Sequence, residues 1–267
     1  MLPIMNIAGT TLRWALRDRL LHALLGVSLL VLLLVPLFST FSMRQVQELS
    51  ITLSLSSLSF TLLVLSILLG ASSVWRDVER RYTVAVLTLP VSRASYLLGK
   101  FVGVALIILI CSLLLSLVSF PVIVLSAAQY PSEIPIHWGN LILAVGANCL
   151  KYILLATIAL FFSCIGTSFF LPFFAAISIY LAGSASQDVF EYISGEFGRT
   201  VSPAGKLLAK GAYYLLPNFS AFDLQVQAIY GLPVPTGGLV YTLLYFLVYT
   251  ATVLVLAVWV FSRRELP

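Results

Sequence analysis

Few side chains in this sequence have the types and spacing that catalysis or metal binding requires. The two histidines, His22 and His137, are far apart and form no HExxH pair. Gly99-Lys100 lacks the upstream glycine of a phosphate-binding GxxxxGK[ST] loop, and no GxSxG motif is present. The three cysteines lie in apolar stretches without CxxC spacing and are expected to be buried small side chains: Cys111, Cys149 and Cys164. We therefore expect no catalytic residues, no metal and no cofactor in this chain.

Lys151 is the one strong base in a long apolar stretch, from 134 to 187. A lysine at the centre of a membrane costs about 2.5–3.5 kcal/mol, so its side chain must face protein or water. Asn148 precedes it by three residues and shares its helix face. One interpretation is that Lys151 and Asn148 line a path for a polar or anionic substrate. The other is that the lysine snorkels, or bonds carbonyl groups inside a helix bundle.

Hydroxyl side chains form a stripe that includes Ser112 and Ser116 at helical spacing. Small residues of this kind let helices approach closely in lipid, so close packing is the favoured interpretation. A polar path lined by Ser112, Ser116, Asn148 and Lys151 is the alternative.

The composition determines what kind of protein positions these residues. The chain has 267 residues, of which 60% are hydrophobic and 9% charged, and its mean hydropathy is +1.06. So little polar surface excludes a soluble globular protein, a disordered chain and a disulfide scaffold. We expect an all-α membrane protein with one domain, 1–267, because each span needs about 20 apolar residues. The charge-free stretches predict six spans, at about 20–38, 51–74, 101–126, 141–163, 168–186 and 238–261.

The distribution of Lys and Arg predicts the orientation of these spans. With the N-terminus in the cytoplasm, ten basic residues lie inside and four outside. Three of those four belong to one long segment, where the rule is weakest. Both termini are therefore expected in the cytoplasm.

Three segments outside the spans are expected to be helical. Arg13, Trp14 and Arg17 precede the first span and suit a short helix in the membrane interface, or simply a snorkelling flank. The segment at about 76–89 has apolar residues at helical spacing and ends at Pro90. Its apolar face needs either the lipid interface or a protein partner.

The long segment from 184 to 238 carries two further helix signals. Ser202-Pro203 is typical of a helix start, and Pro217 of a helix end. Ser220 and Asp223 begin a second helix that would end at Gly231. We expect two interfacial or re-entrant helices on the outer side, packed on the mouth of the bundle.

The cytoplasmic loop resembles that of the ABC-2 type permease subunits of prokaryotic ABC transporters. The resemblance rests on Glu79, on Thr83, on Pro90-Val-Ser-Arg93 and on Gly99-Lys100 at the start of the third span. It departs at Tyr82, where the family usually has glycine, which puts the local turn in doubt.

Other segments agree along the whole chain, in the family's order. They are Arg17-Asp-Arg-Leu20, Leu216-Pro-Asn218 with Phe222-Asp223, and Phe261-Ser-Arg-Arg-Glu-Leu266. The chain is most similar to the short branch that includes the nitrous-oxide-reductase maturation permeases.

The resemblance implies a mechanism and partners. Two copies, or this chain and a similar permease, would form a dimer around a substrate path in the prokaryotic cytoplasmic membrane. Two separate ATP-binding subunits would bind ATP and Mg and hydrolyse the ATP. Their closure would push on the permease through a coupling helix at about 76–89, and the complex would export its cargo. The residues implied in this coupling are Val78, Glu79, Arg80, Tyr82, Thr83, Pro90 and Arg93. No nucleic acid is expected as a partner.

Two other classes of function are alternatives to a transporter permease. An ion-driven secondary transporter would need paired carboxylates or broken helices inside the membrane, and no Asp or Glu lies deep in an expected span. An intramembrane enzyme would depend on Lys151 and Asn148, which have no acid or nucleophile partner of a known type.

Overall fold

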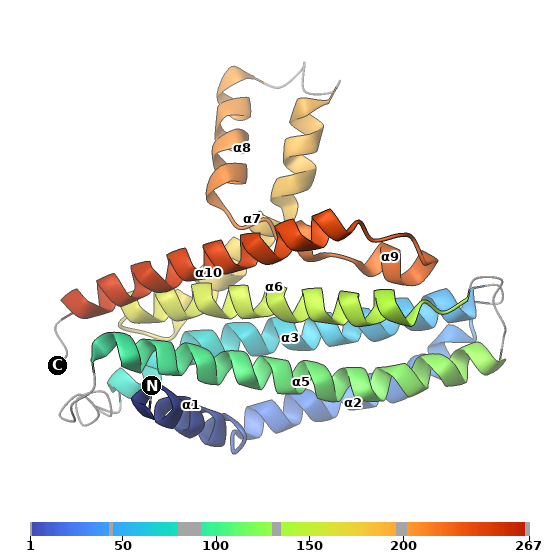
Figure 1. Cartoon of the computed structure of the whole chain (residues 1–267), viewed down its shortest axis with the longest axis horizontal. Helices are drawn as coiled ribbons and strands as arrows, with labels where there is room; N and C mark the ends of the chain where they lie inside the picture. The colour runs from blue at the N-terminus through green and yellow to red at the C-terminus, as the bar shows by residue number, and fades with distance from the viewer. Residues whose placement is uncertain (1, 43–44, 80–91, 130–134, 196–201, 265–267) are drawn as a thin grey trace.

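The computed structural model describes residues 2–42, 45–79, 92–129, 135–195 and 202–264. Every regular element within these ranges is a helix (Figure 1). In chain order the helices are α1 (Leu2–Ala15), α2 (Arg19–Ser39), α3 (Val46–Glu79), α5 (Arg93–Gln129), α6 (Trp138–Ile165), α7 (Phe170–Ser194), α8 (Pro203–Leu215), the 3-10 helix η2 (Ser220–Phe222), α9 (Gln225–Tyr230) and α10 (Thr236–Arg263).

Six of these helices are long and apolar enough to cross a membrane: α2, α3, α5, α6, α7 and α10. This confirms the expected all-α membrane fold with six spans. The long apolar stretch divides where expected, because α6 ends at Ile165 and Gly166 takes an extended conformation after it. Pro36 and Pro121 lie inside α2 and α5 and end neither helix.

Helix α6 is the centre of the bundle. Of its most apolar 18-residue window, 72% is buried, a larger share than in any other described span. It packs against α3, α5, α7 and α10. The close approach of α3 depends on Gly70, since a Cβ there would lie 2.6 Å from the Ala156 carbonyl oxygen. Figure 1 shows α6 running through the middle of the bundle with both chain termini at one end, which we call the terminal end.

Helix α1 lies against the start of α5. Gly99 and Gly103 make this contact possible, because a Cβ at either position would lie under 3 Å from the side chain of Ile7 or Thr11. The helix runs over Leu2–Ala15, so Arg17 lies in the turn that follows. Asp18 then starts α2 by accepting a hydrogen bond from the backbone N–H of Leu20.

The C-terminal part of α7, residues 187–194, and helix α8 form a hairpin that we call the arm. Figure 1 shows the arm standing out from the side of the bundle, across the direction of the spans. Helix α8 has no buried residue and packs on α7. Only η2 and α9 pack on the bundle as expected for the outer segment, where α9 contacts α3 and α6. The expectation that α8 also covers the mouth is wrong, because α8 packs on the α7 part of the arm, where Phe190 stacks on Tyr213 with ring centroids 4.2 Å apart.

Candidate functional site

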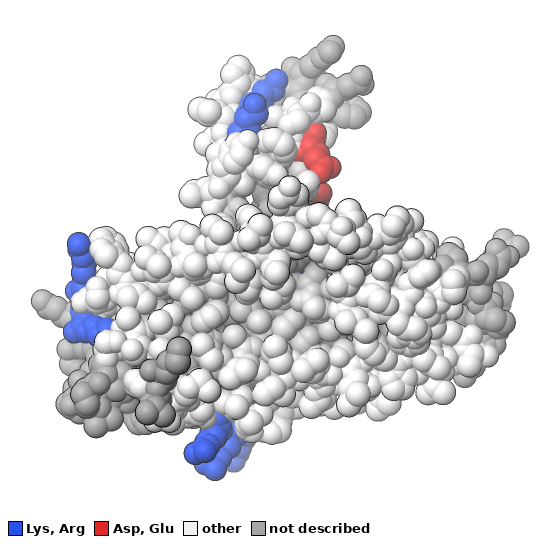
Figure 2. Space-filling view, viewed as in Figure 1, with Lys and Arg blue, Asp and Glu red and all other residues white. Residues whose placement is uncertain are grey.

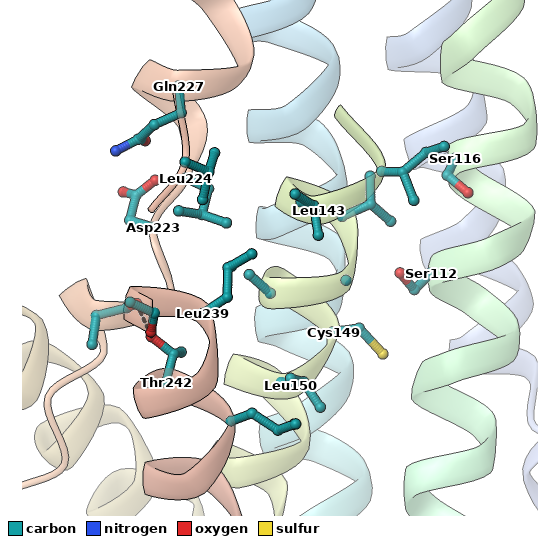
Figure 3. Close-up of a pocket in the computed structure, with 18 of the residues that line it drawn as sticks. Ser112, Ser116, Leu143, Cys149, Leu150, Asp223, Leu224, Gln227, Leu239 and Thr242 are labelled. Atoms are coloured by element: carbon teal, nitrogen blue, oxygen red, sulfur yellow. Dashed lines mark hydrogen bonds between the residues drawn. The ribbon is translucent and has the colours of Figure 1, made fainter. Parts of the chain in front are cut away.

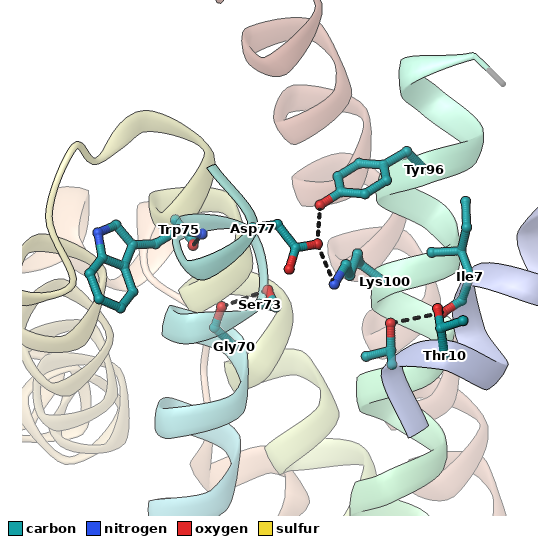
Figure 4. Close-up of polar contacts among 10 residues, drawn as sticks. Ile7, Thr10, Gly70, Ser73, Trp75, Asp77, Tyr96 and Lys100 are labelled. Atoms are coloured by element: carbon teal, nitrogen blue, oxygen red, sulfur yellow. Dashed lines mark hydrogen bonds and ion pairs between the residues drawn. The ribbon is translucent and has the colours of Figure 1, made fainter. Parts of the chain in front are cut away.

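A partly buried polar cluster joins α3 to α5 at the terminal end of the bundle (Figure 4). The Lys100 ammonium lies 2.6 Å from Oδ2 of Asp77, and the Tyr96 hydroxyl donates to the same oxygen at 2.6 Å. Asp77 is near the last residue of α3, and both partners lie in the first turns of α5. Charge-assisted bonds of this kind are about twice as strong as neutral ones. They therefore fix the two helix ends that flank residues 80–91.

A second contact ties the first two helices to α3. Arg76 lies 3.5 Å from the Asp18 carboxylate, and its guanidinium lies 3.9 Å from the ring centroid of Trp14. The indole is thus partly covered by protein. Arg13 and Arg17 are exposed, as expected for an interfacial segment. Figure 2 shows basic side chains gathered at this edge of the bundle.

Two arginines, Arg93 and Arg264, connect α5, α10 and α6 at the same end; we call them the arginine junction. Arg93 Nη1 donates to the carbonyl oxygens at the end of α10, those of Phe261, Ser262 and Arg264, at 2.9–3.1 Å. The side chain of Arg264 in turn donates to the Cys164 oxygen at 2.7 Å. These donors satisfy carbonyl groups that a helix end leaves without intrahelical partners. Arg93 therefore bonds within this chain, although the resemblance implied a role for it toward a partner.

The other residues implied in coupling fall into two groups. Helix α3 continues through Val78 and Glu79, so no separate helix begins at residue 76. The Val78 side chain packs inward on the apolar cluster that contains Tyr96 and Phe261, whereas Glu79 is exposed at the helix end. Arg80, Tyr82, Thr83 and Pro90 lie outside the described residues.

Lys151 is buried in the middle of the bundle, with 9% of its surface exposed. Its Nζ lies 5.6 Å from the ring centroids of both Tyr152 and Tyr180, on α6 and α7. This distance is within the range of cation–π attraction. The structure thus gives Lys151 aromatic neighbours.

Asn148 joins α6 to α3 on the inner side of the bundle. Its Oδ1 accepts a hydrogen bond from the Ser59 hydroxyl at 3.0 Å. Asn148 and Lys151 therefore belong to the interior between α6 and its neighbours α3 and α7.

Ser112 and Ser116 lie elsewhere, in a groove of about 880 Å³ that we call the lateral groove. One wall is α5 from Leu109 to Phe120, and the floor is α6 from Ile142 to Ile153. The other wall is made by residues of η2, α9 and the start of α10 (Figure 3). The four residues expected to line one path are thus divided between two places: Ser112 and Ser116 in the groove, and Asn148 and Lys151 in the interior.

Hydrogen bonds hold the second wall of the lateral groove in place. The Asn140 amide on α6 donates to the carbonyl oxygens of Gln227 and Leu232, both at 2.9 Å. The Thr242 hydroxyl on α10 donates to the Ala221 oxygen at 3.3 Å. The short helices before α10 are therefore fixed against the bundle.

Asp223 and Gln227 are polar groove residues that were not predicted from the sequence as site residues. They are four residues apart at the start of α9, and Figure 3 shows their side chains next to each other. The available signal was that acidic residues are rare in this chain and that Asp223 follows a helix start. No lining residue of the groove is Lys, Arg or His.

These geometries suit binding and mechanical coupling. In the described ranges no group of three His, Cys, Asp or Glu side chains is placed to hold a metal ion. The polar groups either join helices or line the groove.

Comparison with known families gives one result for nearly the whole chain. Residues 5–266 match the family model described as ABC-2 family transporter protein. No curated protein matches the chain.

Proposed function

This chain belongs to the ABC-2 transporter family of membrane proteins, and from this premise we propose that it is the permease subunit of an ABC exporter, driven by two separate ATP-binding subunits. The observation that carries the proposal is the construction of the terminal end. There, the end of α3 and the start of α5, which flank residues 80–91 in the sequence, are joined by partly buried charged groups.

We infer that the terminal end faces the cytoplasm. Cytoplasmic ends of membrane proteins carry an excess of Lys and Arg. The basic residues at the ends of α3 and α10 and at the start of α5 support this orientation: Arg76, Arg93, Lys100, Arg263 and Arg264. Both chain termini lie at this end (Figure 1).

Force on the loop has a direct route into the bundle. Residue 80 follows Glu79 at the end of α3, and residue 91 lies two positions before Arg93. Through the arginine junction, movement of Arg93 is passed to the end of α10 and then to the carbonyl groups that end α6. ATP-driven closure of the partner subunits would thus move α3, α5, α6 and α10 together. This supports coupling through the loop more than an enzymatic role.

We further propose that two copies of this chain assemble, since the arm exposes an apolar surface on α8. Leu207, Leu208 and Leu215 on α8 are 73–77% exposed. Exposed leucines alone suit lipid equally well. The charged side chains of the arm favour contact with protein instead, because charges are costly beside lipid.

The test is co-purification of the tagged chain, expressed with its neighbouring genes, followed by an assay of vanadate-sensitive ATP hydrolysis. We expect a partner that contains a GxxxxGK[ST] loop. Glu79→Arg should reduce its recovery roughly tenfold, the effect of losing a hydrogen bond to a charged group of about 1.5–3 kcal/mol. Arg13→Glu, a charge reversal on the neighbouring helix α1, is the matched control and should leave recovery unchanged.

Three outcomes would contradict parts of the proposal. Equal recovery with Glu79→Arg removes Glu79 from the contact. A chain that purifies without any ATP-binding partner contradicts the coupling itself. Transport that persists without ATP and collapses with an ion gradient would favour a secondary transporter.

A further inference from the structure

We propose that the lateral groove binds an amine-headed lipid of the surrounding bilayer, with an aliphatic chain along α6 and its ammonium group at Asp223 and Gln227. This goes beyond the proposed transport function, because the groove is a separate place from the terminal end and from the interior around Lys151.

The body of the groove is built for an aliphatic chain. Its floor and walls are formed mainly by Leu, Ile, Val, Ala and Gly residues. Leu113, Ile142 and Leu243 line it while being 47–60% exposed, so the groove opens on the side of the bundle. All three belong to spanning helices, and hydrocarbon is the surrounding that such helices meet in a membrane.

The size of the groove suits one chain with its head group. Its volume of about 880 Å³ is at the upper end of ordinary ligand pockets, which range over about 300–1,000 Å³. At Gly146 on the floor, an added Cβ would meet no atom within 4 Å. The floor therefore has open space where a ligand can lie directly against the backbone of α6.

The polar end of the groove offers acceptors. Gln227 Oε1 is buried and has no hydrogen-bond partner in the described part of the chain. Asp223 is exposed; it accepts one backbone bond, from the N–H of Gln225 at 3.0 Å, and takes part in neither of the two ion pairs of the described residues. Buried acceptors are almost always paired in native proteins. Gln227 Oε1 therefore calls for a hydrogen-bond donor from a ligand.

The charge at this end selects the head group. Asp223 is the one ionisable acid among the lining residues, and none of them is a base. A ligand that brings an ammonium group supplies both positive charge and N–H donors. A head group with a net negative charge is repelled by the Asp223 carboxylate. These two terms rank bilayer lipids as phosphatidylethanolamine above phosphatidylcholine, whose quaternary ammonium group is cationic but has no N–H, and both above phosphatidylglycerol, which carries a net negative charge.

The test is native mass spectrometry of the delipidated full chain after addition of equal amounts of these three lipids with identical acyl chains. We expect bound phosphatidylethanolamine to exceed phosphatidylglycerol about tenfold, the effect of a hydrogen bond to a charged group. Asp223→Asn should bring the ratio close to one while keeping the Oδ1 acceptor for Gln225. Asp188→Asn, an exposed acid on the arm, is the matched control and should keep the wild-type ratio.

A second variant tests the body of the groove independently of charge. Gly146→Trp should fill the floor and abolish binding of all three lipids. Gly139→Trp is its control, on the same helix, with equal free space and outside the groove. Unchanged lipid binding in Gly146→Trp, or a lipid ratio unaffected by Asp223→Asn, would overturn the proposal. A Gly146→Trp variant that keeps its lipid and loses its dimer would overturn it as well, and would assign the groove to contact between copies.

Discussion

Lys151 shows how this membrane protein accommodates a charge with little help from water. Its Nζ lies 5.6 Å from the rings of Tyr152 and Tyr180, at the outer part of the useful range. At this distance each of the two cation–π contacts contributes about 0.5–1 kcal/mol, or about 1–2 kcal/mol together, whereas insertion of a central lysine costs about 2.5–3.5 kcal/mol. The free energy lost by burying the lysine therefore exceeds the free energy gained from its aromatic contacts, and the fold does not need the charge.

This balance predicts that Lys151→Met stabilises the protein. We expect a net gain of about 1 kcal/mol, which corresponds to a rise in Tm of about 2–4 °C for a chain of this size. Thermal denaturation followed by fluorescence-detected size exclusion measures it, with Arg17→Met, an exposed base in the turn after α1, as the control. A fall in Tm would mean that the tyrosine contacts outweigh the desolvation cost. Loss of transport in the more stable variant would assign Lys151 to the substrate path.

At the scale of the elements, the sequence predicted the spans well and the helix ends poorly. Spans follow from the absence of charge, because hydrocarbon excludes it. Helices α3 and α5 continue past the apolar stretch, since Asp77 and Lys100 pair with each other there and remain compatible with a helix. A hydropathy pattern ends at the first charge, whereas a helix ends where its hydrogen bonds end.

The candidate site was only partly predictable for a related reason. Each residue of a helix turns its side chain by about 100° relative to the last. Asn148 therefore faces α3, while its neighbour Cys149 lines the lateral groove. Spacing places residues on one face, but it does not reveal which helix covers that face. The arginine junction could not be predicted from spacing either, because it joins residues about 170 positions apart, such as Arg93 and Arg264.

The arginine junction leads to a prediction for the end of α10. Arg93→Ala removes the side-chain donor from three carbonyl groups, so the last turn of α10 should fray. We expect hydrogen exchange of the amides near Phe261 to accelerate about tenfold, since a hydrogen bond from a charged group contributes about 1.5–3 kcal/mol. ATP-binding partner recovery should be retained, and transport should fall. Arg263→Ala is the control, because it removes a neighbouring guanidinium that lies over the ring of Trp259.

Two results would argue against this function of Arg93. Unchanged exchange near Phe261 would show that the carbonyl contacts do not hold the helix end. Loss of the ATP-binding partner in Arg93→Ala, with α10 still protected, would instead return Arg93 to the partner contact that the resemblance implied.

At the scale of the whole molecule, the arm is the part on which the proposed assembly of two copies depends. It carries Asp188 and Glu191 on α7 and Lys206 and Lys210 on α8. Figure 2 shows the acidic and basic side chains on different sides of the arm, and neither ion pair of the described residues joins them. Such charges are costly beside lipid. An acidic edge and a basic edge on one hairpin are complementary to a second copy related by a two-fold axis.

This arrangement predicts that charge reversal on either edge weakens the dimer and that reversal on both restores it. The double variant Lys206→Glu, Lys210→Glu places acidic side chains opposite acidic ones. The double variant Asp188→Lys, Glu191→Lys places basic side chains opposite basic ones. Each double variant should therefore shift the dimer toward monomer on dilution. The fourfold variant exchanges the edges and should dimerise again, because like charges at an interface are unfavourable and opposite ones favourable in either direction. Mass photometry in lipid nanodiscs reads the populations, with Arg13→Glu as a reversal away from the arm. A dimer fraction that none of these reversals changes would mean that the arm meets lipid or another protein, and that the copies associate through a different face.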